Sequence, residues 1–349
     1  MVFTGKSLCA AVLTGAALAA LLASCGRPKA TPPGTRVKIS NVEPRRDVQG
    51  NIIDAHDGCL QFFDGRFYLY GTAYGTNDGW GTANRYRVYS SPDLGTWTLE
   101  GNLLTNQPKG VYYRPYVVLN PTTKKYVLWY NWYPQGWAGA EGVAVSDTPV
   151  GPFTITETNV LRSFAKIQPG DGSLFVDDDG KGYYIFTAIA DDYTVRVAAL
   201  TPDFLGLTGN TSPVLAHGAE SPVLFRRNNT YYALFGPLCA FCPEGSIVQV
   251  VTLSSPLGPF FHPCPKINRQ GTNNIPIVSG QETWVAKIPT PDGPAYIWMA
   301  DLWGLTPDGL RGHDFQFWSL PLEFAQDGDI LPLRPVGKWY IMENGNRQQ

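Results

Sequence analysis

Apolar and polar positions alternate along this chain in short runs, and each run ends at a turn signal. One unit recurs: an apolar strand, a turn carrying Asp-Gly, Asn or Pro residues, and a strand rich in aromatic side chains. Its instances are LQFFDGRFYLYG, VVLNPTTKKYVLWY, SLFVDDDGKGYYIFTA, VLFRRNNTYYALFG and WVAKIPTPDGPAYIWMA, with aromatic strands that begin near residues 67, 126, 183, 231 and 296. Alternation between turns predicts β-hairpins, and no helical period of any length persists after the N-terminal segment.

These hairpins predict a repeating all-β fold. Each is followed by a second pair of strands, as in RYRVYSSPDLGTWTLEG and GVAVSDTPVGPFTI. Five units of four strands, each too small to bury a core alone, predict a five-bladed β-propeller. A β-sandwich rarely repeats so regularly, and the repeats of a β-helix are much shorter. The innermost strands of a propeller line a central channel, so residues at the starts of these strands converge there.

The N-terminal segment differs from the rest of the chain. Lys6 precedes the apolar stretch LCAAVLTGAALAALLAS, and Cys25 and GRPKATPPGTR follow it. This pattern predicts a signal peptide over residues 1–25, a Pro-rich tether over 26–44 and a propeller domain over 45–340. The stretch that ends at Cys25 resembles a bacterial lipobox, whose cysteine becomes lipid-modified, and the alternative is an ordinary cleavage site. We therefore expect an exported protein, anchored to the cell envelope through Cys25 or secreted.

The composition of the chain limits the classes of partner that it is expected to bind. The 349 residues carry a net charge of -2, and 16% are charged, so the basic excess that binds nucleic acid is missing. Aromatic residues make up 13% of the chain, beside 37 Gly and 29 Pro, which is typical of proteins built from short strands and turns. Weakly charged, aromatic-rich β proteins often handle sugars. We expect an oligo- or polysaccharide partner, no nucleic acid, and a monomer.

Cysteines and a run of aspartates add two smaller expectations. Export permits disulfides, and four cysteines follow residue 25: Cys59, Cys239, Cys242 and Cys264. We expect a disulfide that ties a loop, with its pairing open. The DDDG sequence at 177–180 lacks the spaced oxygen ligands of a calcium loop and predicts a hairpin turn.

Three acidic residues carry the candidate chemistry. Alignment of the repeats puts Asp57, Asp171 and Glu220 at the mouth of the first strand of blades one, three and four, in similar register. Any one of them could be a turn residue, but three on one axis favour catalysis. Glycoside hydrolysis needs a protonated carboxyl that donates to the leaving oxygen and a carboxylate that activates water. A third carboxylate can keep the acid protonated by raising its pKa.

The sequence resembles glycoside hydrolase family 43 over about residues 45 to 335. The resemblance rests on HDGCLQFFDGRFYLYG, YSSPDLGTWTLEGN, DGSLFVDDDGKGYYIF and ESPVLFRRNNTYYALFG. It implies that Asp57 is the general base, Asp171 the pKa modulator and Glu220 the general acid. It also implies an inverting, exo-acting glycosidase acting on galactan-, arabinan- or xylan-derived glycosides. No cofactor is required, beyond at most a structural calcium.

Within this family, GQETWVAKIP, YIWMADLW and FWSLPLEF are most similar to the exo-β-1,3-galactanase branch. In that branch a glycine takes the base position and a glutamine matching Gln281 takes part instead. This chain has Asp57, and it has Tyr113 where the branch carries Glu before Arg-Pro. The released sugar therefore stays open between arabinose, xylose and galactose. The alternative from another class is a catalytically silent carbohydrate-binding propeller, which would not need all three acids.

Further residues are expected near the channel mouth. His56 either orients substrate or bonds the backbone of blade one. Trp137 is a further stacking candidate, although aromatic residues more often pack between blades. His313 in LRGHDFQF matches a family histidine that holds an ion or water near the axis, or else is structural. The expected substrate-binding residues are His56, Tyr113, Arg114, Gln281, Trp80, Trp132 and Trp303.

Overall fold

The computed structural model describes residues 36–161, 168–239, 242–259, 261–273 and 275–342. The predicted signal peptide, Cys25 and residues 26–35 lie outside this part of the chain. Within it, no helix has both the length and the apolar character needed to cross a membrane.

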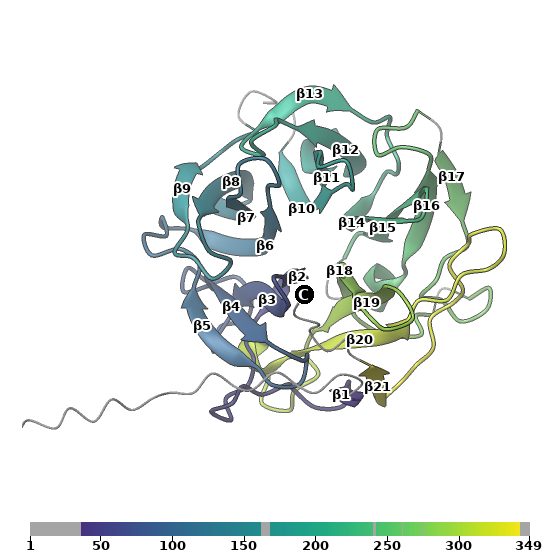
Figure 1. The fold of residues 1–349 in the computed structure, drawn as a ribbon, viewed down its shortest axis with the longest axis horizontal. Helices are drawn as coiled ribbons and strands as arrows, with labels where there is room; N and C mark the ends of the chain where they lie inside the picture. The colour runs from purple at the N-terminus through teal and green to yellow at the C-terminus, as the bar shows by residue number, and fades with distance from the viewer. Residues whose placement is uncertain (1–35, 162–167, 240–241, 260, 274, 343–349) are drawn as a thin grey trace, which may run out of the picture.

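Five antiparallel sheets surround one axis, which confirms the predicted five-bladed β-propeller (Figure 1). Blade one consists of β2 (His56–Phe63), β3 (Arg66–Ala73), β4 (Arg85–Ser91) and β5 (Thr98–Asn102). Blade two consists of β6 (Val111–Leu119), β7 (Tyr126–Gln135), β8 (Ala138–Ser146) and β9 (Thr154–Glu157). Blade three consists of β10 (Pro169–Val176), β11 (Gly182–Ala188), β12 (Thr194–Leu200) and β13 (Leu207–Thr211). Blade four consists of β14 (Ala219–Arg227), β15 (Thr230–Pro237), β16 (Gln249–Leu253) and β17 (Phe261–Cys264).

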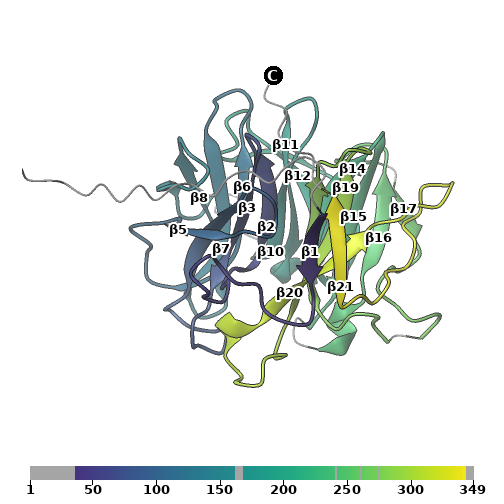
Figure 2. The same ribbon diagram turned by 60° about the horizontal axis from the view of Figure 1, so that its bottom comes forward.

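Blade five corrects the expectation of four strands in every unit. It has three strands: β18 (Gln281–Ile288), β19 (Ala295–Leu302) and β20 (Phe315–Pro321). Beside it, β1 (Arg36–Ser40) pairs with β21 (Lys338–Met342), as Figure 2 shows. Asn41 occupies the open edge of β20, because its side chain both accepts from the backbone N–H of Trp318 and donates to the carbonyl of Trp318, each at 2.9 Å. The two ends of the described chain thus protect the last sheet edge.

The predicted tether was therefore too long. Residues 36–40 form a strand, because Val37 and Ile39 alternate with polar neighbours and are buried. The predicted turn at 177–180 is confirmed: the N–H of Gly180 donates to the carbonyl of Asp177, and Gly180 has a φ of 83°.

All five innermost strands change register near their starts. The shifts lie between His56 and Cys59, Tyr113 and Pro115, Pro169 and Gly172, Glu220 and Val223, and Glu282 and Trp284. Each time, the inner strand has one residue more than its partner, which is the pattern of a β-bulge. Bulges turn side chains out of the sheet, so the mouth of the channel receives side chains that a regular strand would direct into the blade.

Candidate active site

A pocket of about 310 Å³ lies at this mouth of the channel. All five blades contribute to its wall, and eight residues singled out in the sequence line it: Asp57, Tyr113, Arg114, Trp137, Asp171, Glu220, Gln281 and Trp303. The three acids, which are far apart in sequence, therefore face one space.

Their positions around the bulges are neighbouring rather than equivalent. Asp57 is the first unpaired residue of the bulge in β2, and Asp171 is the second in β10. Glu220 is the last paired residue before the bulge in β14. The glycine after each aspartate has a steric cause: a Cβ on Gly58 would lie 2.0 Å from the Tyr70 carbonyl oxygen, and one on Gly172 would lie 2.1 Å from the Tyr184 hydroxyl. In each Asp-Gly pair, the glycine leaves room for atoms of the adjacent strand, and the aspartate before it carries its carboxylate to the channel mouth.

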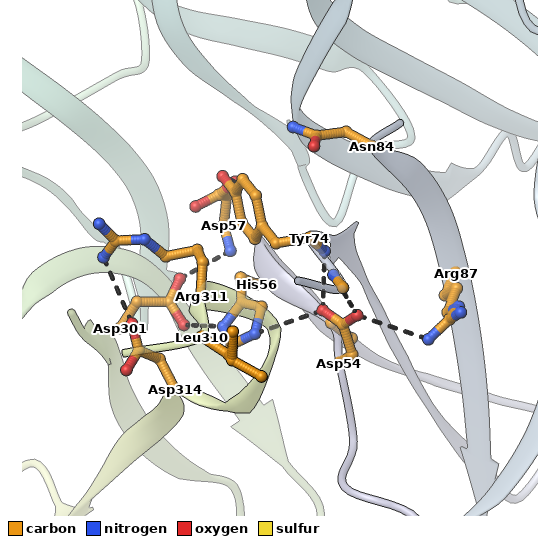
Figure 3. A network of polar contacts seen from close by, with 12 residues as sticks. Asp54, His56, Asp57, Tyr74, Asn84, Arg87, Asp301, Leu310, Arg311 and Asp314 are labelled. Carbon is orange, nitrogen blue, oxygen red and sulfur yellow. Dashed lines mark hydrogen bonds and ion pairs between the residues drawn. The ribbon is translucent and has the colours of Figure 1, made fainter. Parts of the chain in front are cut away.

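Asp57 is buried and held from two sides (Figure 3). The Tyr74 hydroxyl donates to its carboxylate, and its own backbone N–H donates to Asp301 Oδ2 at 2.7 Å. The backbone of Asp57 is left-handed, with a φ of 58°, which an L-residue adopts at a cost and which the Asp301 bond helps to hold. Burial and the nearby charge of Asp301 raise the pKa of Asp57 to about 6. Asp57 is therefore a carboxylate at neutral pH whose basicity exceeds that of an exposed aspartate.

His56 precedes Asp57 in β2 but does not line the pocket. Its ring is 1% exposed, with Nδ1 3.2 Å from Asp301 Oδ1 and Nε2 3.5 Å from Asp54 Oδ1 (Figure 3). Burial opposes the charged ring, but the hydrogen bond and charge of Asp301, with the charge of Asp54, raise the pKa of His56 to about 9. The expectation of direct substrate contact is wrong for this buried side chain. As a cation next to Asp301, His56 helps to fix the carboxylate that holds Asp57.

Asp171 is bound within a network that crosses four blades. Arg114 Nη2 lies 3.0 Å from Asp171 Oδ2 and 2.8 Å from Ser221 Oγ, and Ser221 donates to the same carboxylate oxygen from N–H and Oγ at 3.1 and 3.0 Å. Gln281 Nε2 donates to Ser221 Oγ at 2.8 Å, and Trp303 Nε1 donates to Gln281 Oε1 at 3.0 Å. Gln281 is therefore engaged at both ends of its amide, and the network fixes Asp171 beside Glu220.

Glu220 has the properties of a proton donor. Burial and the negative charge of Asp171 raise its pKa to about 8, against the opposing effect of Arg114. Its Oε1 is buried without a hydrogen-bond partner among the described residues. A carboxyl that is neutral at pH 7 and has an unpaired oxygen in a pocket can donate its proton to a bound oxygen.

Three expected site residues lie elsewhere. Trp132 is buried within blade two, where its Nε1 donates to the Thr158 carbonyl, so its predicted contact with substrate is wrong. His313 is partly exposed and pairs with Asp308, with Nδ1 2.6 Å from Oδ2, so it does not line the pocket either. Trp80 stands next to the pocket rather than in its wall. Among the described residues, no group of three or more His, Cys, Asp or Glu side chains could hold a metal ion.

The sequence-based prediction missed several residues that matter to the site. Tyr74 and Asp301 hold Asp57, and Tyr133 lines the pocket. The sequence held one indication of Asp301: this acid interrupts the apolar run of β19, and a buried acid needs a partner.

The expected disulfide joins Cys239 to Cys242, while Cys59 and Cys264 are free.

We expect the pH profile of kcat/KM to be bell-shaped, with limbs near pH 6 and pH 8. Below about 6 Asp57 becomes protonated and cannot accept a proton, and above about 8 Glu220 loses the proton it must donate. In Asp171→Asn the repulsion that raises the Glu220 pKa is gone, so the alkaline limb should move to lower pH. Profiles of both proteins measure this, and an alkaline limb that stays in place in the variant would refute the modulator role.

An ionised and a protonated carboxyl group at one channel mouth are the pair that a carbohydrate-cleaving hydrolase needs. The comparisons specify the family. The model of Glycosyl hydrolases family 43 matches residues 73–300. The chain belongs to this family and is a glycosidase that hydrolyses O-glycosyl bonds.

The individual relatives are distantly similar to this chain in sequence. A β-D-galactofuranosidase of Aspergillus niger is 27% identical over 291 residues, which cover 79% of this chain and 82% of that protein. An arabinoxylan arabinofuranohydrolase of Bacillus subtilis is 29% identical over 261 residues, which cover 60% of this chain and 50% of that protein.

Solved structures agree in fold. A family 43 β-1,3-galactosidase with galactodeoxynojirimycin matches with a TM-score of 0.73 and 25% identity, covering 86% of this chain and 99% of that one. An exo-β-1,3-galactanase from Clostridium thermocellum matches with a TM-score of 0.76 and 24% identity, covering 88% and 68%.

Proposed function

We propose that this protein is an inverting, exo-acting glycosidase that releases a terminal galactose or arabinose from plant-type polysaccharides or their side chains. One observation carries the proposal: Asp57 and Glu220 face the same pocket, and their surroundings favour opposite protonation states at neutral pH. The relatives that act on galactofuranosides, arabinoxylan and β-1,3-galactan support these two sugars over others.

The mechanism follows from the two protonation states. The Asp57 carboxylate takes a proton from a water molecule, whose oxygen attacks the anomeric carbon as the glycosidic bond breaks. Glu220 gives its proton to the departing oxygen, so Asp57 ends protonated and Glu220 ionised. Asp171 keeps Glu220 protonated before the reaction, and Arg114 holds Asp171 in place. The sugar is released with inverted configuration.

The proposal also covers the localisation and the oligomeric state of the enzyme. We infer that residues 1–25 direct export, that Cys25 carries a lipid anchor, and that the propeller acts as a monomer at the cell envelope without a required cofactor. The lipobox-like sequence before Cys25 supports the anchor.

We expect the purified protein to release one sugar from a panel of galactosides, arabinosides, xylosides and β-1,3-galactan. Proton NMR during the first minutes should show the product anomer opposite to that of the substrate. Retained configuration would refute inversion, and internal cleavage fragments would refute exo action. Tight binding without any release would favour the silent carbohydrate-binding propeller instead.

A further inference from the structure

Two tryptophans of this chain are conspicuously exposed. All ten tryptophans lie within the described residues, and of these only Trp80, 39% exposed, and Trp137, 71% exposed, are exposed to this degree. The others are buried or partly buried, as a large apolar ring ordinarily is. Exposed aromatic rings that cluster on a surface usually mark a binding site.

The two rings form a single platform from loops of different blades. Trp80 follows β3 in blade one, and Trp137 lies in the turn between β7 and β8 of blade two. Their ring centroids are 4.1 Å apart, at an interplanar angle of 33°. Tyr133 supports both, with centroid distances of 5.4 Å to Trp80 and 5.8 Å to Trp137. The carbonyl of Trp137 also accepts a hydrogen bond from Gln168 Nε2, so the turn is held toward blade three.

The platform stands where substrate leaves the pocket. Trp137 lines the pocket together with Asp57, Arg114 and Gln281, but those three residues are buried and close its floor. A terminal sugar seated among the acids can continue only toward solvent. The strongly exposed Trp137 lies at that opening, so it is positioned for the part of the substrate beyond the scissile bond.

We propose that Trp137, backed by Trp80, is the subsite for the sugar ring that carries the leaving oxygen. The inference rests on the proposed function and adds the residues that bind the leaving group, a sugar ring with an apolar C–H face. Such a face lies flat on an indole, and the contact removes exposed aromatic surface from water. Trp80 acts as a positioning residue, because its ring packs against that of Trp137.

The test compares two substrates of the same terminal sugar. One is an oligosaccharide from which the wild type releases that sugar, and the other is the glycosyl fluoride, whose leaving group has no ring. In Trp137→Ala we expect the ratio of kcat/KM for the oligosaccharide to that for the fluoride to fall about tenfold. Trp137→Phe, which keeps an aromatic face, should restore most of the ratio. Tyr340→Ala is the control, since Tyr340 is also exposed, at 54%, but lies on β21 away from the pocket.

An unchanged ratio in Trp137→Ala would overturn the subsite, because the two substrates would then depend on this ring equally or not at all. Failure of the phenylalanine variant to restore the ratio would also count against stacking. If the wild type releases sugar from no oligosaccharide of the panel, the proposed function is overturned, and the subsite with it.

Discussion

Glu220→Gln is expected to lower the release of sugar from oligosaccharides by roughly a hundredfold or more. Glutamine keeps the size of the side chain but cannot give up a proton at neutral pH, so the leaving oxygen departs as an unstabilised anion. The loss should therefore depend on the leaving group. An aryl glycoside releases a phenolate that needs no protonation, so the variant should lose far less activity on it than on an oligosaccharide. Steady-state rates on both substrates measure this difference.

Glu141→Gln is the matched control for this variant. Glu141 is also buried, and burial raises its pKa to about 8, but its carboxyl group accepts a hydrogen bond from Asn131 Nδ2 and does not line the pocket. We expect its activity to stay within a few-fold of wild type. An equal loss in both variants would mean that burying a glutamine damages the blade, and an equal loss on both substrates would contradict acid catalysis by Glu220.

The sequence was sufficient for the fold and the acids because both rest on local repeats. Each hairpin has its own alternation and turn, so five similar units predict a ring without any knowledge of contacts between them. Two of the three carboxylates follow because Asp57 and Asp171 lie in Asp-Gly pairs that recur near the start of the first strand of their repeats. The expectation of four strands failed at blade five, where the chain closes the ring. The strand pair beside this blade could not be predicted, because β1 is short, begins after a Pro-rich segment, and pairs with a strand about three hundred residues away.

The remaining errors concern partners that only ring closure brings together. Asp301 reaches Asp57 because blade five meets blade one, and no pattern within either repeat indicates this. The tryptophans show the same limit. Trp132 and Trp137 are five residues apart, yet the first is buried in blade two and the second is exposed in the turn between β7 and β8. Strand alternation predicts that a ring faces one side or the other, but not which side a neighbouring blade covers.

Asp57→Asn is expected to reduce kcat by on the order of a thousandfold, and by a similar factor for good and poor leaving groups. Activation of water is needed whichever group departs, so the loss should lack the leaving-group dependence of Glu220→Gln. The acidic limb of the pH profile, near pH 6 in the wild type, should also disappear, because it reports the protonation of Asp57. Rates for a series of leaving groups, and the pH profile of the residual activity, measure both effects.

Gln281→Ala tests whether Asp57 or Gln281 activates the water, since a matching glutamine takes part in place of the base in the galactanase-like branch. In this chain both ends of the Gln281 amide are bound, by Ser221 and Trp303, whereas Asp57 is a carboxylate that faces the pocket. Removing Gln281 takes away its two hydrogen bonds, with Ser221 and Trp303, from the network around Asp171, which should cost about tenfold in kcat/KM. A loss in Gln281→Ala as large as that in Asp57→Asn would contradict the assignment of Asp57 as the base, since water activation would then pass through the amide.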